Sequence, residues 1–145
     1  MKAVIQRVKG SSVSVDGKII GRIGKGMLVL LGVAKGDTDR QVEDLVAKVT
    51  HLRMFEDEQG KMNLSAKECQ AEFLVVSQFT LLANCDKGRR PSFDGAAAPE
   101  QAKVIYELFI SKLRSHNFKV ETGQFAAMMD VSLVNDGPVT FVLDG

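Results

Sequence analysis

Two apolar segments are each followed directly by a polar motif, and this pattern limits the folds open to the chain more than any other feature. Residues 73–76 lead into the motif of residues 77–81, and residues 131–134 lead into the motif of residues 135–140. Short apolar runs are typical of buried strands, so both motifs are expected where a strand ends. Two polar strand ends in one small domain predict one shared pocket. The Gly137-Pro138 step adds a rigid backbone element, because proline fixes its own φ angle and removes a hydrogen-bond donor.

The size and charge of the chain exclude several classes of protein. With 45% hydrophobic residues, residues 1–145 are expected to form a single domain. A formal net charge of +1 gives no general basic field, so any contact with RNA must use a local patch. Cys69 and Cys85 are too few for a disulfide framework, and we find neither a signal-peptide pattern nor an apolar run that would span a bilayer. We therefore expect a cytoplasmic protein with no membrane partner.

The spacing of apolar residues predicts an α+β fold. Apolar positions at helical spacing indicate a helix from Asp39 to Leu52, with Thr38 and Gln41 in the relation of a capping box. Pro99 suits the first turn of a second helix that ends near Asn117. Strands are expected at residues 3–8, 12–15, 19–23 and 27–33 as a β meander with a turn at Asp16-Gly17, then at 73–82 and from 118 onward, with an irregular loop at 83–98. These elements favour a strongly curved, barrel-like mixed or antiparallel sheet with two main helices over a doubly wound parallel sheet.

A conventional catalytic side chain is missing from the sequence. His51 and His116 are the only histidines, and both fall near the end of an expected helix, where a polar side chain commonly satisfies terminal carbonyls. Neither stands in a context that indicates a nucleophile and its base. The cysteines and histidines also lack the spacing of zinc ligands, so we expect neither a metal nor another cofactor.

The motif of residues 77–81 offers a different kind of site. Backbone amides together with Ser77, Gln78 and Thr80 are able to orient a substrate and stabilise an oxyanion without transferring a proton. Such a site suits an ester that is already activated. The alternative interpretation is that these side chains only cap or pair a strand end, and composition alone favours that alternative.

The irregular loop carries the best candidate contact for phosphate. Lys87, Arg89 and Arg90 lie close together and are followed by Phe93. Arginine matches the geometry of phosphate with two hydrogen bonds, and an aromatic ring stacks on unpaired bases. The alternative is a solvated loop without a ligand, which is common for short clusters of cations.

These motifs together resemble the D-aminoacyl-tRNA deacylase family, formerly called D-tyrosyl-tRNA deacylases. The resemblance runs from the first expected strand to the last. The chain departs from the pattern of many members at Met128, but alternation along a strand predicts that this side chain faces away from Met129. The resemblance rests on Gln6-Arg7-Val8, Leu52-Arg53, Gly60-Lys61-Met62-Asn63-Leu64, Ser77-Gln78-Phe79-Thr80-Leu81, Arg90-Pro91-Ser92-Phe93 and residues 131–140.

The resemblance implies a proofreading hydrolase that cleaves the ester between a D-amino acid and the terminal ribose of tRNA. The family is a homodimer in which the counterpart of Gly137-Pro138, a cis peptide, enters the partner's pocket and blocks the side chain of an L-amino acid. Glycine has no side chain, so glycine mischarged on alanine tRNA is an expected second substrate. The implied roles are catalytic backbone amides at Phe79 and Thr80, substrate contacts at Ser77, Gln78, Met129, Gly137 and Pro138, support of the Gly-Pro backbone by Arg7, and tRNA contacts at Lys87, Arg89 and Arg90.

Two mechanisms and two rival functions stay open. The family is held to use the neighbouring 2′-hydroxyl of the tRNA in catalysis, which explains why no histidine base is needed. In the competing mechanism the Thr80 hydroxyl is the nucleophile, although it has no evident activating base. Of the rival functions, a noncatalytic RNA-binding module would bind tRNA without turnover, and a small-molecule esterase would cleave D-amino acid esters that lack the ribose diol.

Overall fold

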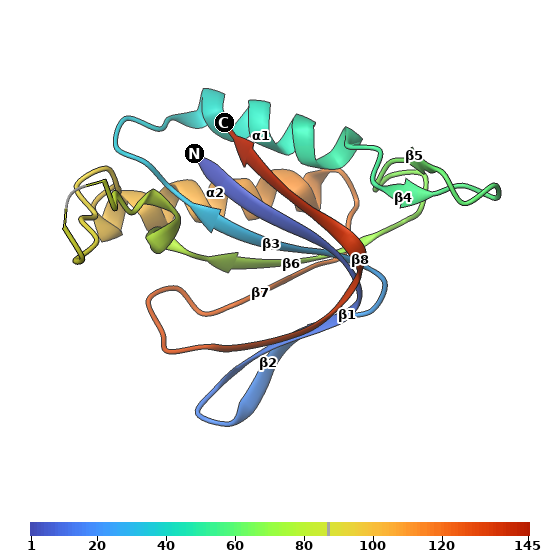
Figure 1. The fold of residues 1–145 in the computed structure, drawn as a ribbon, viewed down its shortest axis with the longest axis horizontal. Coiled ribbons are helices and arrows are strands. Elements are labelled where there is room, and N and C mark those ends of the chain that lie inside the picture. Colours follow the sequence, from blue (N-terminus) through green and yellow to red (C-terminus); the bar gives the residue numbers. More distant parts are fainter. Residues whose placement is uncertain (87) are drawn as a thin grey trace.

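The computed structural model describes residues 1–86 and 88–145, and it has two helices packed on one side of a strongly curved sheet (Figure 1). The expected α+β class is confirmed. Within the described residues, no helix has both the length and the apolar character needed to cross a membrane. The elements in chain order are β1 (Lys2–Val15), β2 (Lys18–Ile23), β3 (Gly26–Gly32), α1 (Asp39–His51), β4 (Phe55–Glu56), β5 (Met62–Leu64), β6 (Glu72–Ser77), the 3₁₀ helix η1 (Phe79–Leu82), α2 (Pro99–Ser115), β7 (Val120–Thr122) and β8 (Asp130–Asp144).

The first three strands form one long, bent hairpin, so the expected meander is wrong. β3 pairs with the first half of β1 and β2 pairs with its second half, both antiparallel. The register is the same on both sides of the junction, with Val8 opposite Gly26 and Ser11 opposite Ile23. β2 and β3 are therefore two halves of one strand. Only the turn at Asp16-Gly17 reverses the chain, whereas the glycine-rich segment between β2 and β3 merely bends it.

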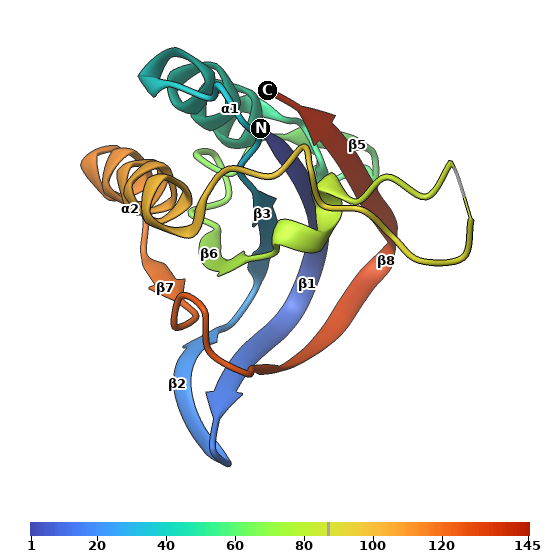
Figure 2. The same ribbon diagram turned by 90° about the vertical axis from the view of Figure 1, so that its left-hand side faces the viewer.

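The remaining strands extend this hairpin into a mixed sheet. β8 follows the other edge of β1, while β6 and β7 continue beyond β3 in parallel. Parallel neighbours need crossover connections, which run through α1 from β3 to β6 and through α2 from β6 to β7. Both helices lie on the same side of the sheet (Figure 2). The main core forms between them and the sheet, where Ile5, Val29 and Val75 join Val46 of α1 and Phe109 of α2.

The opposite face of the sheet curls over a second, smaller core. Here β2 and the second half of β1 bring Val13 and Ile23 into one cluster with Leu28 and Val76. One edge of this cluster is incompletely covered. The apolar side chains that pack against it while partly exposed are Leu30, Met129, Val131 and Leu133.

Local sequence signals explain the helix boundaries. At the start of α1, the Thr38 N–H donates to Gln41 Oε1 at 3.0 Å, as expected for a capping box. Pro99 is the first residue of α2. His51 Nδ1 lies 2.9 Å from the carbonyl oxygen of Ala47 in the last turn of α1. The capping box, the proline at the start of α2 and the bond of His51 to a carbonyl of its helix are as predicted.

The strand expected over residues 73–82 ends early, at Ser77. Residues Phe79–Leu82 instead turn into η1. The turn packs closely against the end of β3. A side chain at Gly32 would overlap the last residue of the turn and approach Gln78 O to 3.0 Å, so the turn rests on bare backbone.

The register between β8 and β1 shifts at two points, and the larger shift lies at Arg7. Between the partners of Gln6 and Val8, β8 contains residues 136–139, where regular pairing would place one residue opposite Arg7. The extra residues form a loop, called the Gly-Pro loop below. Bulges of this kind re-aim a strand and often lie beside functional sites.

Candidate active site

The Gly-Pro loop is held by one buried arginine. Arg7 is 4% exposed, and its guanidinium donates to Asp136 O and to Met54 O, each at 2.8 Å. Its charge is paired with the Glu56 carboxylate at 3.2 Å and with the Asp136 carboxylate at 3.3 Å. The peptide bond of Gly137-Pro138 is cis, and both residues are exposed. The loop is thus anchored at its first residue and open to the outside at its centre.

Asn135 holds the same loop at its other end. Its Nδ2 donates to Arg7 O at 3.1 Å and to Val139 O at 3.0 Å. Sequence reasoning assigned roles to Gly137-Pro138 but none to Asn135 or Glu56. A signal existed for Asn135, because asparagine in turns commonly bonds to nearby backbone. No local signal shows that Glu56, far away along the chain, pairs with Arg7.

The η1 turn presents two backbone donors. Its first internal hydrogen bond runs from Leu81 N–H to Gln78 O at 3.3 Å, so the N–H groups of Phe79 and Thr80 come before the first donor of the helix and have no acceptor within it. Both residues are exposed, and Ser77 is half-buried at the end of β6. Gln78 Nε2 donates to Thr80 Oγ1 at 2.6 Å. A carboxamide is not a base near neutral pH, so this bond orients the hydroxyl without activating it.

Groups suited to general base catalysis lie elsewhere. His51 and His116 stand at the ends of α1 and α2. The Tyr106 hydroxyl donates to Val75 O at 2.8 Å, and burial raises the pKa of Tyr106 well above its usual range, which gives this group a structural role. Over the part of the chain that the structure describes, the only side-chain partner of the Thr80 hydroxyl is an amide.

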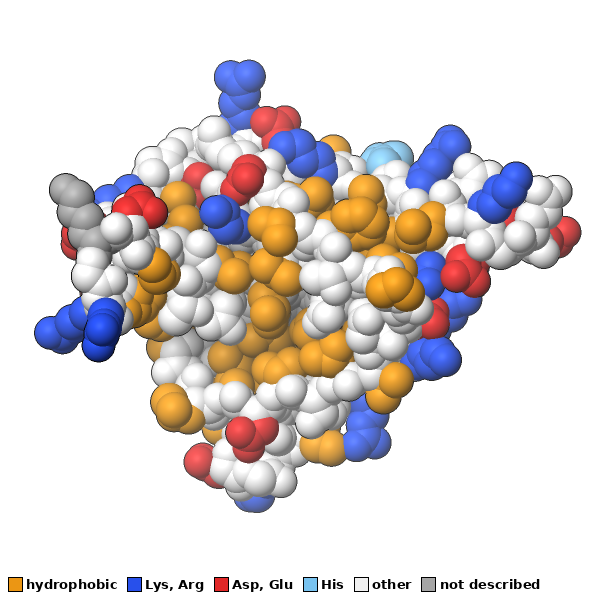
Figure 3. Space-filling model, in the orientation of Figure 1, with side chains coloured by type: hydrophobic (Ala, Val, Ile, Leu, Met, Phe, Trp, Pro, Cys, Tyr) orange, Lys and Arg blue, Asp and Glu red, His pale blue; other side chains and the backbone are white. Residues whose placement is uncertain are grey.

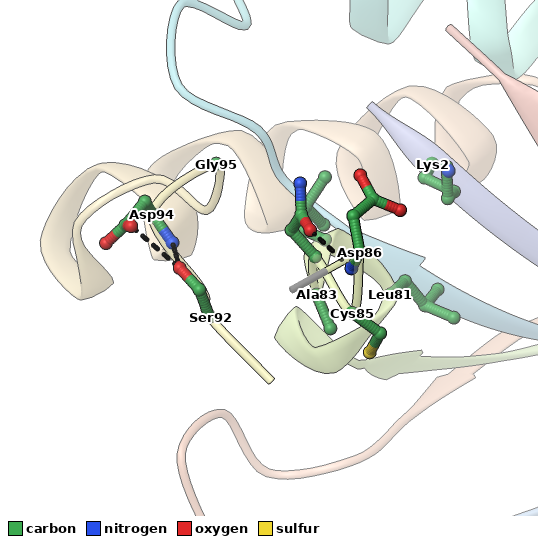
Figure 4. Close-up of a pocket in the computed structure, with 10 residues that line it drawn as sticks. Lys2, Leu81, Ala83, Cys85, Asp86, Ser92, Asp94 and Gly95 are labelled. Atoms are coloured by element: carbon green, nitrogen blue, oxygen red, sulfur yellow. Dashed lines mark hydrogen bonds between the residues drawn. The ribbon is translucent and has the colours of Figure 1, made fainter. Parts of the chain in front are cut away.

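A cavity of about 660 Å³ lies beside the η1 turn. Figure 4 shows Lys2 of β1 on one side of it, Ser92 and Asp94 on the other, and residues 81–86 between them. The irregular loop is closed at its base, where Asn84 and Ser92 exchange two backbone hydrogen bonds of 2.8 and 2.9 Å. The cavity adjoins the turn but is not lined by its two free donors.

The basic residues lie in the loop beyond this closure. Arg89 and Arg90 are exposed, while Lys87, which was predicted with them, lies outside the described residues. Phe93 follows the base of the loop, and its ring packs on that of Phe79 with 5.0 Å between the centroids. An aromatic contact therefore joins the basic loop to the turn that carries the donors.

Met129 lies near the end of β6, at the open edge of the second core. A side chain at Gly123 would come within 2.6 Å of Met129 Sδ and 3.6 Å of Val76, the residue before Ser77. Met128 is 92% exposed. Both methionines precede β8 and lie outside any strand, so the expectation from strand alternation does not apply to them. Apolar side chains gather across the middle of the side shown in Figure 3, with Lys and Arg toward its margins.

The Gly-Pro loop and the η1 turn are far apart in one chain. The loop faces Arg7, whereas η1 rests on Gly32, which pairs with Lys2 at the start of β1. At about 3.3 Å per residue, the distance from Lys2 to Arg7 along the strand is roughly 17 Å. The expectation of one shared pocket is therefore wrong for a single chain, because the two polar strand ends point to different places.

Known proteins resemble this chain over nearly its full length. The family model described as “D-Tyr-tRNA(Tyr) deacylase” matches residues 4–144. Proteins named “D-aminoacyl-tRNA deacylase” from Desulfatibacillum aliphaticivorans and Thermosipho melanesiensis are 58% and 56% identical to it, over 99% of this chain and 99% and 97% of their own. A solved structure described as “c-Myc DNA Unwinding Element Binding Protein” has a TM-score of 0.94 and 44% identity, covering 100% of this chain and 99% of the other. Another, of a “probable eukaryotic D-amino acid tRNA deacylase”, has a TM-score of 0.83 at 18% identity over 98% and 97% of the two chains, which shows a common fold.

Proposed function

The chain belongs to the D-aminoacyl-tRNA deacylase family, and we propose that it hydrolyses the ester between a D-amino acid and the terminal ribose of tRNA. The observation that carries this proposal is the family match over residues 4–144, which spans both the η1 turn and the Gly-Pro loop. The products are a free D-amino acid and a tRNA that is ready for another round of charging. The cytoplasm, where tRNA is charged, is the proposed compartment.

The Gly-Pro loop acts on the active site of a partner subunit in a homodimer. Two observations support this arrangement. The loop and the η1 turn are too far apart to meet within one chain, and the central residues of both are exposed. In the dimer, the backbone carbonyls of Gly137 and Pro138 occupy the space that an L side chain would need, so selectivity arises by exclusion. Glycine passes this barrier, which makes glycine on alanine tRNA a second substrate.

Catalysis uses backbone donors together with the ribose of the substrate. The N–H groups of Phe79 and Thr80 stabilise the oxyanion that forms when water attacks the ester carbonyl. The 2′-hydroxyl of the tRNA assists this attack, and the departing ribose oxygen takes up a proton. Ser77, Gln78 and Met129 shape the pocket. The amide partner of the Thr80 hydroxyl supports this mechanism over a Thr80 nucleophile, because a nucleophilic hydroxyl needs a base.

The basic loop binds the phosphates of tRNA. Arg89 and Arg90 are exposed beyond the closed base of the loop, next to the aromatic contact between Phe93 and Phe79. Lys87 belongs to the same proposal. Phosphate bound here would lie close to the turn that receives the ester.

The proposal is tested by release of labelled amino acid from D-tyrosyl-tRNA and L-tyrosyl-tRNA, with a chelator present. Two further substrates are run in parallel: glycine attached to alanine tRNA, and D-tyrosyl-tRNA with a 2′-deoxy terminal adenosine. We expect loss of the D-tyrosyl and glycyl labels only, and no loss from the deoxy substrate. Hydrolysis of the deoxy substrate would show that the protein, and not the 2′-hydroxyl of the tRNA, supplies the catalytic group. Tight tRNA binding without turnover would favour an RNA-binding module, and cleavage of simple D-tyrosine esters would favour an esterase.

The role of Thr80 is tested in the same assay with Thr80→Val, which removes only the hydroxyl. We expect turnover within about threefold of the original protein, since the backbone N–H remains in place. Thr80→Ser, which keeps a hydroxyl, is the matched control. A loss of about a thousandfold in the valine variant, with activity retained in the serine variant, would establish the nucleophile mechanism instead.

A further inference from the structure

The Gly-Pro loop leaves the β1–β8 ladder without leaving the gap unpaired. Arg7 has no backbone partner on β8, and a strand position that loses its partner needs another donor for its carbonyl. The Asn135 side chain supplies it, because Nδ2 bonds to Arg7 O on one side of the gap and to Val139 O on the other. One side-chain amide therefore bridges β1 and the point where the loop rejoins β8.

Gly137 leaves room for this amide. A Cβ atom at position 137 would overlap Asn135 Oδ1, and it would lie 3.1 Å from Asn135 Cγ and 3.3 Å from Val139 N. Gly137 is not among the residues with a positive φ angle. The glycine is thus required for space and not for its backbone angle, and positions 135 and 137 are a matched pair.

The two anchoring residues, Arg7 and Asn135, act at different ends of the loop. Arg7 holds the carbonyl of Asp136, where the loop begins, and Asn135 holds the carbonyl of Val139, where it ends. We infer that Asn135 is a positioning residue that sets the stereochemical selectivity of the enzyme, an inference that rests on the proposed function of the loop. To exclude an L side chain, the Gly-Pro loop must keep its position when that side chain presses on it. Without the second anchor, the loop gives way to an L side chain, while a D substrate does not press on it.

The first test measures the hydrolysis rates of D-tyrosyl-tRNA and L-tyrosyl-tRNA for Asn135→Ala and Asn135→Asp. We expect the ratio of the D rate to the L rate to fall about tenfold in both variants, mainly through a faster L rate, with the D rate within about threefold. The aspartate keeps the size of the side chain but has no N–H to donate, whereas the alanine removes the same two hydrogen bonds without adding a charge, so a change common to both variants reports the loss of the bonds. Ser132→Ala, at an exposed position of the same strand, is the matched control and keeps the original ratio.

The ratio separates positioning from simple stabilisation. A residue needed only for folding would lower both rates in proportion, because less active enzyme would be present, and the ratio would stay constant. An unchanged ratio in both Asn135 variants overturns the inference. If the original protein has no D-specific activity, the proposed function fails. That outcome differs from failure of the inference, in which the original protein is D-specific and the Asn135 variants keep its ratio.

A second test does not depend on activity. Gly137→Ala is measured by thermal unfolding in the original protein and in the Asn135→Ala variant, at one protein concentration. We expect a shift of the melting temperature by several degrees in the original protein and a clearly smaller shift when the amide is gone, because the overlapping atoms are then absent. Equal shifts in both backgrounds would show that the two positions do not form a pair.

Discussion

The Gly-Pro loop and the η1 turn lie near opposite ends of the first half of β1, and they are built in opposite ways. The loop uses its polar groups internally, because Arg7 and Asn135 bond to both of its ends and the guanidinium is buried. The turn keeps its groups free, with two N–H donors outside its own hydrogen bonds and with Phe79 57% exposed. A part that excludes a substrate must be stiff, whereas a part that binds one must leave donors unpaired.

This contrast predicts which measured quantity responds at each place. Changes at the loop should alter stability and the choice between D and L substrates. Changes at the η1 turn should alter the rate without altering that choice. Changes in the basic loop should alter only the affinity for tRNA.

The largest effect is expected for Arg7→Met. Methionine keeps a long, unbranched side chain but removes the hydrogen bonds to Asp136 and Met54. Two backbone carbonyls and two carboxylates then lose their partner, so the free energy of unfolding should fall by about 3 kcal/mol. Urea unfolding at fixed protein concentration measures this. Arg22→Met, at an exposed position of β2, is the control and should change stability by less than about 0.5 kcal/mol. Equal stability of the two variants would mean that the loop is not held in the way described.

A smaller effect, read out in the rate of hydrolysis, is expected for Gly32→Ala. The new methyl group would overlap Leu82 and approach Gln78 O to 3.0 Å, so it displaces the η1 turn and its donors. We expect kcat for D-tyrosyl-tRNA to fall about tenfold, because misplaced donors stabilise the oxyanion poorly. The L rate should fall in step. Gly10→Ala, whose nearest neighbour would be an ordinary 3.5 Å away, is the matched control. A changed ratio of D to L rates would show that the η1 turn also takes part in chiral selection, contrary to the contrast drawn with the Gly-Pro loop.

Sequence reasoning succeeded where local chemistry decides the structure. The capping box at Thr38 and the proline at the start of α2 depend on neighbours along the chain, and both are as predicted. The early end of β6 instead brings the η1 turn against Gly32, a contact between segments that are far apart in the sequence. Likewise, β2 and β3 are one strand because β1 is long enough to pair with both, which no local signal reveals.

The candidate site divides in the same way. The motifs that carry Thr80 and Gly137 were recognised from their residue types and order. Support of the loop by Arg7 was implied by the family resemblance, but its pairing with Glu56 was not predicted, because that pair joins residues from β1 and β4 that meet only in the folded chain. Asn135 lies between these cases: it was given no role, although asparagine in turns commonly bonds to nearby backbone, and its partner on β1 did not follow from the sequence.

The smallest effects are expected for Arg89→Ala and Arg90→Ala, since both residues are exposed and belong to neither the Gly-Pro loop nor the η1 turn. Each change should raise KM for tRNA about threefold and reduce the salt dependence of binding by about one phosphate contact, while kcat and the ratio of D to L rates stay the same. Steady-state kinetics at several salt concentrations measure both. Lys67→Ala, an exposed cation at the opposite end of β6, is the matched control. If the arginine variants instead lowered kcat, the contact between Phe93 and Phe79 would be transmitting the state of the basic loop to the donors. Binding and catalysis would then be coupled, and the η1 turn would be less independent of its surroundings than its free donors indicate.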